Sequence, residues 1–124
     1  MAMAYHSCVH PIYHITSKSE WNEAEHKGIY DRSTRGKSFD EVGFIHASTL
    51  DQLPDTANFV FAGTDVELVV IELDIGTLEL SGIQVVFEDG GDGQIYPHIY
   101  STIPTDLIVG VHAVEFDGSN FRIV

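Results

Sequence analysis

The segment from Val66 to Leu73 constrains the fold of this chain more than any other. It reads Val-Glu-Leu-Val-Val-Ile-Glu-Leu, a nearly continuous apolar run of strand length. Runs of this kind are typical of strands that are buried on both faces. With 124 residues, the chain has the usual size of one domain and can build one core. The run therefore predicts a central strand that other elements cover on both sides.

The rest of the chain supplies many short strands and two early helices. Further β-rich runs predict strands at residues 9–15, 42–47, 95–100, 107–116 and 121–124, with weak alternation at 78–80 and 84–87. Capping-box spacings begin helices at about 18–27 (Ser17 with Glu20) and 50–61 (Thr49 with Gln52), and Pro54 is expected to kink or restart the second. Residues 31–38 are expected to form an exposed loop, and the glycine-rich acidic segment 88–93 a turn.

This order of elements lacks the regular alternation of strand and helix that a doubly wound sheet requires. We therefore expect an α+β fold with a split or mixed β-sheet core and short helices. Residues 10–124 are expected to form a single domain after a loosely ordered start at residues 1–9, since no internal repeat, linker or low-complexity segment divides the chain.

The charge of the chain excludes several classes of function. Six Lys and Arg residues against nineteen Asp and Glu residues give a formal charge of −13, which disfavours broad binding to a phosphate backbone. No stretch reaches the roughly twenty apolar residues of a membrane span, and the first residues lack a secretory signal. A single cysteine, Cys8, excludes an intrachain disulfide. We expect a cytoplasmic protein that binds neither bulk nucleic acid nor membranes. The sequence does not determine its oligomeric state.

Three histidines have a common context, because His14, His46 and His98 each fall in or at the end of a predicted strand. Imidazole exchanges protons near neutral pH, so a shared position would make these residues candidates for catalysis. The alternative is that each is a hydrogen-bonded core or edge residue. Three placements of this kind, in a residue type without strand preference, favour a shared site.

Several neighbours of the histidines are candidates for ligand binding. Strand alternation would place Thr16 beside His14 and Ser48 beside His46, although both hydroxyl residues also suit helix capping. Tyr13, Tyr96 and Tyr100 adjoin the histidines and suit either a pocket for flat rings or ordinary strand packing. The cationic cluster Arg32, Arg35 and Lys37 can bind a small anion or be a solvated loop.

The residues around the histidines resemble the bacterial domain of unknown function 952 family. The blocks that carry the resemblance are Ile12-Tyr13-His14-Ile15-Thr16, Gly43-Phe44-Ile45-His46-Ala47-Ser48-Thr49 and Tyr96-Pro97-His98-Ile99-Tyr100. It covers about residues 11–114. The resemblance implies no established activity, and it implies a fold similar to that of ADP-ribosyltransferases, in which NAD lies in the cleft of a split sheet.

By that likeness, His14 and Thr16 would hold the nicotinamide ribose, His46 would line the nicotinamide pocket and His98 would take the third position. NAD or an ADP-ribose-like nucleotide is then the implied ligand or substrate, with Arg32 and Arg35 meeting its phosphates. The family likeness puts a carboxylate at the third position, whereas this chain has His98 there. This difference argues against conventional protein ADP-ribosylation. The remaining functions are transfer to or from a phosphorylated nucleotide, or binding alone.

Other classes of function stay open from the sequence. Paired His-x-Thr and His-x-Ser motifs occur in two-histidine phosphoesterases, although no internal repeat supports that class here. Three imidazoles can bind zinc or iron, although no ligand pair has close spacing, so no metal site is assigned. A non-enzymatic ligand- or protein-binding module is the remaining alternative, and whether the protein is an enzyme is left open.

Overall fold

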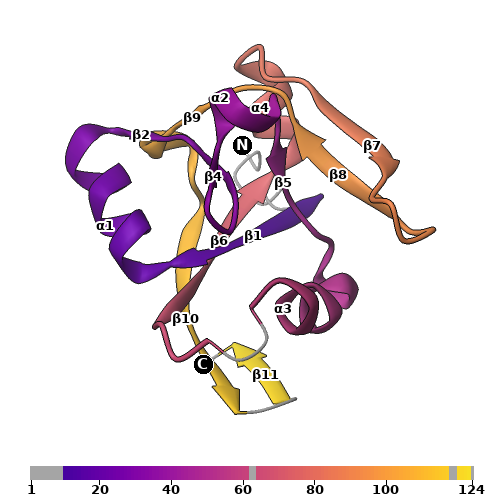
Figure 1. Cartoon of the computed structure of the whole chain (residues 1–124). Helices are drawn as coiled ribbons and strands as arrows, with labels where there is room; N and C mark the ends of the chain where they lie inside the picture. Colours follow the sequence, from indigo (N-terminus) through magenta and orange to yellow (C-terminus); the bar gives the residue numbers. More distant parts are fainter. Residues whose placement is uncertain (1–9, 62–63, 118–119, 124) are drawn as a thin grey trace, which may run out of the picture.

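The computed structural model describes residues 10–61, 64–117 and 120–123. It contains a four-stranded sheet in the order β1 (Pro11–Ser17), β6 (Leu68–Asp74), β10 (Gly110–Asp117) and β11 (Asn120–Ile123). A three-stranded sheet has the order β5 (Ile45–His46), β8 (Ile95–Ile99) and β7 (Val85–Asp89). Two strand pairs complete the set, β2 (Ile29–Tyr30) with β9 (Ile103–Pro104) and β3 (Arg32–Thr34) with β4 (Lys37–Ser38). Figure 1 shows the β7–β8 hairpin extending away from the crossing of β1 and β6.

In the described part of the chain, four short α-helices connect the strands, as expected for an α+β fold. They are α1 (Lys18–Lys27), α2 (Phe39–Val42), α3 (Leu53–Phe61) and α4 (Ile75–Leu80), with 3₁₀ turns η2 at Leu50–Gln52 and η3 at Thr105–Leu107. The predicted helix at 18–27 is confirmed, and the Ser17 side chain accepts a hydrogen bond from the backbone N–H of Glu20. The second predicted helix restarts near Pro54, because η2 ends at Gln52 and α3 begins at Leu53.

The two larger sheets meet at one short joint. Tyr13 of β1 and Ser48, just after β5, exchange backbone hydrogen bonds of 2.8 and 2.7 Å, which makes an isolated antiparallel bridge. The backbone N–H of Ala47 donates to the carbonyl of Pro97 at 3.0 Å, which continues the pairing toward β8. Every strand pairing within the described residues is antiparallel, so the expectation of a mixed sheet is wrong and the core is a curled antiparallel one.

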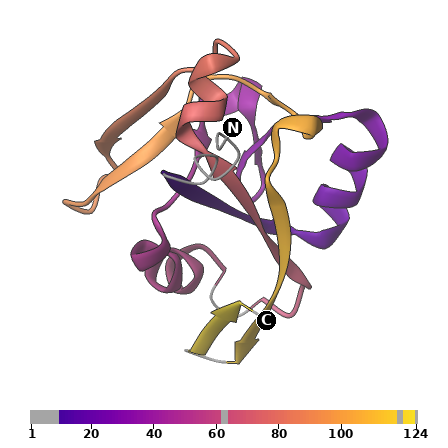
Figure 2. The same ribbon diagram turned by 180° about the vertical axis from the view of Figure 1, so that it is seen from behind.

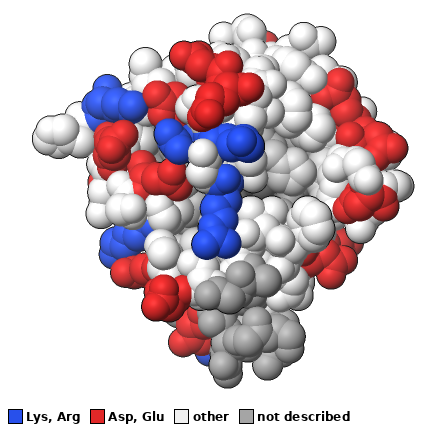
Figure 3. Space-filling model, viewed as in Figure 1, with Lys and Arg blue, Asp and Glu red and all other residues white. Residues whose placement is uncertain are grey.

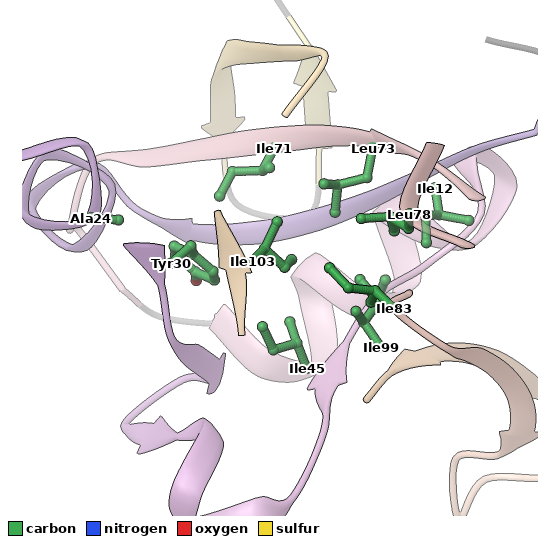
Figure 4. Close-up of a cluster of buried hydrophobic side chains, with 11 residues drawn as sticks. Ile12, Ala24, Tyr30, Ile45, Ile71, Leu73, Leu78, Ile83, Ile99 and Ile103 are labelled. Carbon is green, nitrogen blue, oxygen red and sulfur yellow. The ribbon is translucent and has the colours of Figure 1, made fainter. Parts of the chain in front are cut away.

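The β6 strand is buried on both faces, as its apolar run predicts. Ile71 and Leu73 belong to a core cluster shared with the three-stranded sheet, and Figure 4 shows these two side chains across from Ile45 and Ile99. The alternate residues of β6, Leu68 and Val70, pack in a second cluster with α3. Figure 2 shows the β1 and β6 strands from behind, with α3 and the β10–β11 hairpin below them. The four-stranded sheet therefore separates two cores.

Three local expectations differ from the structure. The segment 31–38 is not an open loop but the β3–β4 hairpin, in which the buried Ser33 hydroxyl donates to the carbonyl of Phe44 at 2.5 Å. The weak alternation at 78–80 is part of α4, because Asp74 caps this helix by accepting from the backbone N–H of Thr77. Only Ile45–His46 of the expected strand at 42–47 is β-structure, since Val42 ends α2.

Two other expectations concern the ends of the chain and the membrane. Residues 1–9, expected to be loosely ordered, and Gly118 of the expected final turn lie outside the described residues. The hairpin predicted there is present on either side, as β10 pairs with β11. Within the described residues, no helix has the length and apolar character needed to cross a membrane.

Candidate functional site

A cavity of about 520 Å³ opens between the β3 strand, the α3 helix and the end of the β7–β8 hairpin. We call it the cleft. Its wall is formed by residues from segments 33–34, 42–46, 55–60, 89–94 and 96–98, which lie far apart in the sequence. This volume is in the range of small-molecule sites, which usually lie between about 300 and 1,000 Å³. The cleft is therefore large enough for a nucleotide-sized ligand.

Two of the predicted histidines form the inner wall of the cleft. His46 and His98 are direct partners across the β5–β8 pair, and their ring centroids lie 5.5 Å apart. The ring of Phe44 stacks on His98 at 4.0 Å with an interplanar angle of 17°, and Tyr96 lies 4.9 Å from His46. All four rings line the cleft. The wall thus offers flat π-surfaces with ring nitrogens among them.

Glu88 holds the His98 ring in a fixed orientation. The carboxylate oxygen Oε1 of Glu88 lies 2.8 Å from His98 Nδ1, and a carboxylate only accepts, so Nδ1 carries the proton and donates. The Tyr100 hydroxyl donates to the same oxygen at 2.5 Å. In neutral His98, Nε2 is then a free acceptor, because no described residue bonds it and the ring is part of the cleft wall.

Glu88 is a site residue that the sequence pattern does not single out, because the glycine-rich acidic segment around it predicts a turn. In the structure, β7 continues to Asp89, and Glu88 lies two residues beyond Val86, the direct partner of His98. Residues two apart in a strand lie on one face, so a hairpin register for residues 85–99 would have identified Glu88. Hydrogen bonds from Tyr100 and then His98 hold the pKa of Glu88 below its usual value, which keeps it ionised.

His46 stays uncharged at neutral pH. Burial is the main cause that lowers its pKa to about 4, and the nearby His14 and His98 lower it further. No described residue makes a hydrogen bond with a ring nitrogen of His46, and the ring borders the cleft. A ligand in the cleft can therefore use the His46 ring both as a stacking surface and as a hydrogen-bond partner.

His14 lies behind this wall and does not border the cleft. It is buried, its Nδ1–H donates to the carbonyl of His46 at 2.6 Å, and its Nε2 accepts from the Tyr30 hydroxyl at 2.6 Å. Burial lowers the pKa of His14 to about 4. With both nitrogens used inside the protein, His14 fixes the backbone of β5 at His46 and so positions the wall.

The predicted hydroxyl residues also make internal bonds. Thr16 Oγ1 donates to Glu20 Oε1 at 3.0 Å, and Ser48 Oγ lies 3.0 Å from Thr56 Oγ1 in a buried pair. Tyr13 and Ser48 border a second void of about 10 Å³, which also touches His14 and His46. This volume is at the lower limit of what can hold a single water molecule. Tyr13, Thr16 and Ser48 therefore lie outside the wall of the cleft.

The two predicted arginines occupy different places. Arg32 Nε lies 3.0 Å from Glu20 Oε2, within an ion pair away from the cleft. The guanidinium of Arg35 donates from Nη1 to the carbonyl of Val60 at 3.0 Å, and Val60 lines the cleft. Arg35 is thus anchored at the rim, although it is not part of the cleft wall.

Charge is divided across the face that carries the cleft. Figure 3 shows Lys and Arg side chains over β3 and β4, acidic side chains over the β7–β8 hairpin, and an uncharged surface between them. Asp55, Asp89 and Asp92 line the cleft itself, whereas none of its lining residues is Lys or Arg. Hydrogen bonds from the Tyr96 hydroxyl, at 2.6 Å, and from the backbone of Gln94 lower the pKa of Asp92. The cleft is therefore an acidic pocket with a basic edge.

In the described part of the chain, the three histidines do not gather with other ligand side chains into a metal site. Among residues 10–61, 64–117 and 120–123, no group of three or more His, Cys, Asp and Glu side chains is arranged to hold a metal ion. The ring nitrogen of His98 nearest a carboxylate is already bonded to Glu88. The geometry of the described residues therefore gives the metal-binding alternative no support.

These features define a class: a small α+β protein with a curled antiparallel sheet and an acidic cleft whose inner wall is built from two paired histidines. The chain belongs to the family described as "Protein of unknown function (DUF952)", whose model matches residues 15–111. The predicted family is thereby confirmed.

Solved structures of one bacterial protein share this fold. The crystal structure of CC0527 from Caulobacter crescentus is 25% identical, with a TM-score of 0.74 over 93% of this chain and 94% of that chain. A double mutant of CC0527 gives 0.73 with the same identity and coverage, and its solution NMR structure gives 0.71 over 90% of each chain. The comparison with curated proteins finds no match. Likeness to ADP-ribosyltransferases stays a prediction.

Proposed function

We propose that this protein binds a small ligand through a flat nitrogen-containing ring, as in NAD or an ADP-ribose-like nucleotide, against the His46–His98 wall. The observation that carries the proposal is the set of neighbouring aromatic rings, from Phe44 to Tyr96, that lines a cavity of about 520 Å³. Aromatic faces with a few convergent polar atoms are typical of sites for flat rings.

The remainder of a nucleotide would extend toward the basic edge. A pyrophosphate is disfavoured inside the cleft, because Asp55, Asp89 and Asp92 are there. Arg35 lies at the rim beside Val60, and its guanidinium still has N–H groups that can donate to a phosphate. The charge division therefore gives such a ligand one orientation, with its ring inside and its phosphates beside β3 and β4.

A transferase function is supported by the Glu88–His98 pair. The sequence departs from the family likeness by placing His98 where a carboxylate is expected, and the structure has the carboxylate of Glu88 directly behind it, 2.8 Å away. A carboxylate-oriented imidazole with a free Nε2 has the geometry of a general base toward a hydroxyl in the cleft. We propose that Glu88 and His98 act together in this way if the bound nucleotide is turned over.

A two-histidine phosphoesterase fits this geometry less well. That class needs both motif histidines to face one substrate, whereas both nitrogens of His14 are bonded to Tyr30 and to the carbonyl of His46. Thr16 and Ser48, the hydroxyls of the two motifs, bond Glu20 and Thr56 instead. The cleft wall contains only His46 from these four motif residues.

Calorimetric titration with NAD and ADP-ribose tests the binding proposal. His46→Ala removes one face of the wall, and His98→Phe keeps the stack on Phe44 while removing the ring nitrogens. We expect each change to weaken binding at least about tenfold, the effect of one lost polar or stacking contact. His112→Ala is the matched control, because His112 pairs with Glu72 at 2.7 Å on another sheet.

The melting temperature of each variant is measured beside the titration, so that unfolding is not mistaken for lost binding. Binding that persists unchanged in folded His46→Ala and His98→Phe would place the ligand outside the cleft. A folded parent that binds neither nucleotide would overturn the proposal and favour a protein-binding module.

A further inference from the structure

The charges inside the cleft point to a ligand ring that carries a positive charge. Three carboxylates, those of Asp55, Asp89 and Asp92, line the cavity, and no lining residue among those described is a lysine or arginine. The guanidinium of Arg35 is bonded to the carbonyl of Val60 at the rim. A ring that enters the cleft therefore passes from a basic edge into a negative field.

The histidine wall does not oppose this field. The pKa of His46 is lowered to about 4, so its ring is neutral at pH 7. His98 is bonded to the ionised Glu88, so that the pair carries no net positive charge even when the imidazole is protonated. The histidines thus present π-faces without the repulsion that imidazolium ions would bring to a cation.

The same wall carries a ring nitrogen that is free to bond a ligand. His98 has only 5% of its surface exposed, its Nδ1 is held by Glu88, and its Nε2 has no partner among the described residues. Phe44 and Tyr96 flank the two imidazoles. Aromatic faces attract a cation that lies over them, and carboxylates nearby add to this attraction.

We propose that the cleft selects a cationic nitrogen heterocycle, of the N-alkylpyridinium class, over a neutral ring of the same shape, through the His46–Tyr96 and Phe44–His98 faces and the carboxylates of Asp55, Asp89 and Asp92. This inference rests on the proposed binding of a flat ring. It narrows that proposal to the oxidised, positively charged form of a nicotinamide-type ligand.

Two small probes separate charge from shape. 1-Methylnicotinamide carries a permanent positive charge, and nicotinamide presents the same ring without it. Titration of the ¹⁵N-labelled protein, followed by NMR at the His46 and His98 rings, measures both affinities even when they are weak. We expect the cation to bind about tenfold more tightly at low salt and to lose part of this preference at high salt.

Asp55→Asn tests the role of the carboxylates. Within the described residues, no hydrogen bond ties the Asp55 side chain to the rest of the protein, so the change removes one charge with little effect on shape. We expect the preference for the cation to fall severalfold in this variant. Asp106→Asn, in the exposed η3 turn, is the matched control because it alters net charge equally outside the cleft.

Equal affinity for the two probes, or a preference that Asp55→Asn and Asp106→Asn reduce equally, would overturn the charge selection while leaving ring binding intact. Failure of both probes to perturb His46 and His98 in the folded protein would instead overturn ring binding itself, and the inference with it. Tight binding of the cation that moves other resonances would place its site outside the cleft and also contradict the inference.

Discussion

The two larger sheets each contain a histidine–glutamate pair, and the pairs are built in opposite ways. In the three-stranded sheet, His98 is nearly inaccessible while the side chain of Glu88 is 39% exposed. In the four-stranded sheet, the more exposed partner is His112, at 36%, and Glu72 is at 18%. The distances, 2.8 and 2.7 Å, are almost equal. The same histidine–glutamate contact therefore occurs with the histidine buried in one sheet and with the glutamate more buried in the other.

The difference shows what makes a histidine useful in a site. His98 turns its second nitrogen toward a cavity and is oriented by a carboxylate that reaches solvent. His112 lines neither of the two cavities described here, and its carboxylate partner is the more deeply placed group. The four-stranded sheet is thus the structural half, with cores on both faces, and the three-stranded sheet presents the chemistry.

The largest effect on stability is expected at His14, because this residue belongs to the four-stranded sheet and also positions His46 in the three-stranded sheet. His14→Ala removes the buried hydrogen bonds that His14 makes with the Tyr30 hydroxyl and with the His46 carbonyl. We expect a loss of roughly 2 to 5 kcal/mol in the free energy of unfolding, measured by urea denaturation. His112→Ala should lower the free energy of unfolding by less than about 1 kcal/mol. Equal losses in the two variants would contradict the inference that the buried hydrogen bonds of His14 stabilise the fold.

Acid should destabilise the protein by protonating His14 and His46, the two histidines where the larger sheets meet. The pKa of His14 and of His46 is about 4 in the folded protein, against about 6.5 in the unfolded chain. The unfolded chain binds more protons between these values, so stability is complete above pH 6.5 and falls as the pH falls toward 4. From pH 7.5 to 5 we expect a loss of about 2 kcal/mol for each histidine.

Urea denaturation at the two pH values measures this loss. His46→Gln removes one of the two titrating groups and should flatten the dependence on pH without abolishing it. An unchanged dependence in this variant would show that His46 is protonated equally in the folded and unfolded chains.

A substitution at Gly90 should alter ligand binding in the cleft without affecting the four-stranded sheet. A methyl group at this position would overlap the ring of Tyr96, which borders His46. We expect Gly90→Ala to shift the Tyr96 ring and to weaken NAD binding about fivefold, or roughly 1 kcal/mol. Gly76→Ala in α4 is the control, since Gly76 does not line the cleft. Unchanged NAD binding in Gly90→Ala would exclude Tyr96 from the site.

The smallest expected effect is a change in the pKa of Glu88 when the Tyr100 hydroxyl is removed. Its hydroxyl bond is the first cause that lowers the pKa of Glu88, so Tyr100→Phe should raise that pKa while the bond from His98 keeps part of the shift. The Glu88 side-chain carboxyl resonance, followed by NMR against pH, measures the change. A constant Glu88 pKa would show that Tyr100 contributes nothing to the pair.

The sequence predicted the framework of this fold well where pattern and burial coincide. The apolar run at 66–73 predicts β6, and the cap at Ser17 predicts α1. The prediction failed where a side chain overrides the local pattern. Asp74 turns the alternation at 78–80 into the α4 helix, and the buried Ser33 hydroxyl fixes residues 32–38 as a hairpin.

The candidate site was predictable only in part, because its geometry depends on strand register. Three histidines were selected from their strand context, and the structure places two of them on one wall, with the third, His14, bonded to the carbonyl of His46. Glu88 was missed since its contact with His98 depends on where the β7–β8 turn begins. The division of charge around the cleft likewise follows from tertiary placement rather than from local spacing.

The short joint between the sheets has a consequence for how such a protein diverges. Only the Tyr13–Ser48 bridge, among the strand pairings of the described residues, connects the four-stranded sheet with the segment that leads into the other. Substitutions near the tip of the β7–β8 hairpin can therefore accumulate without disturbing the ladder of β1, β6 and β10. Descendants of one ancestor can in this way acquire different ligand preferences while inheriting the same folding unit.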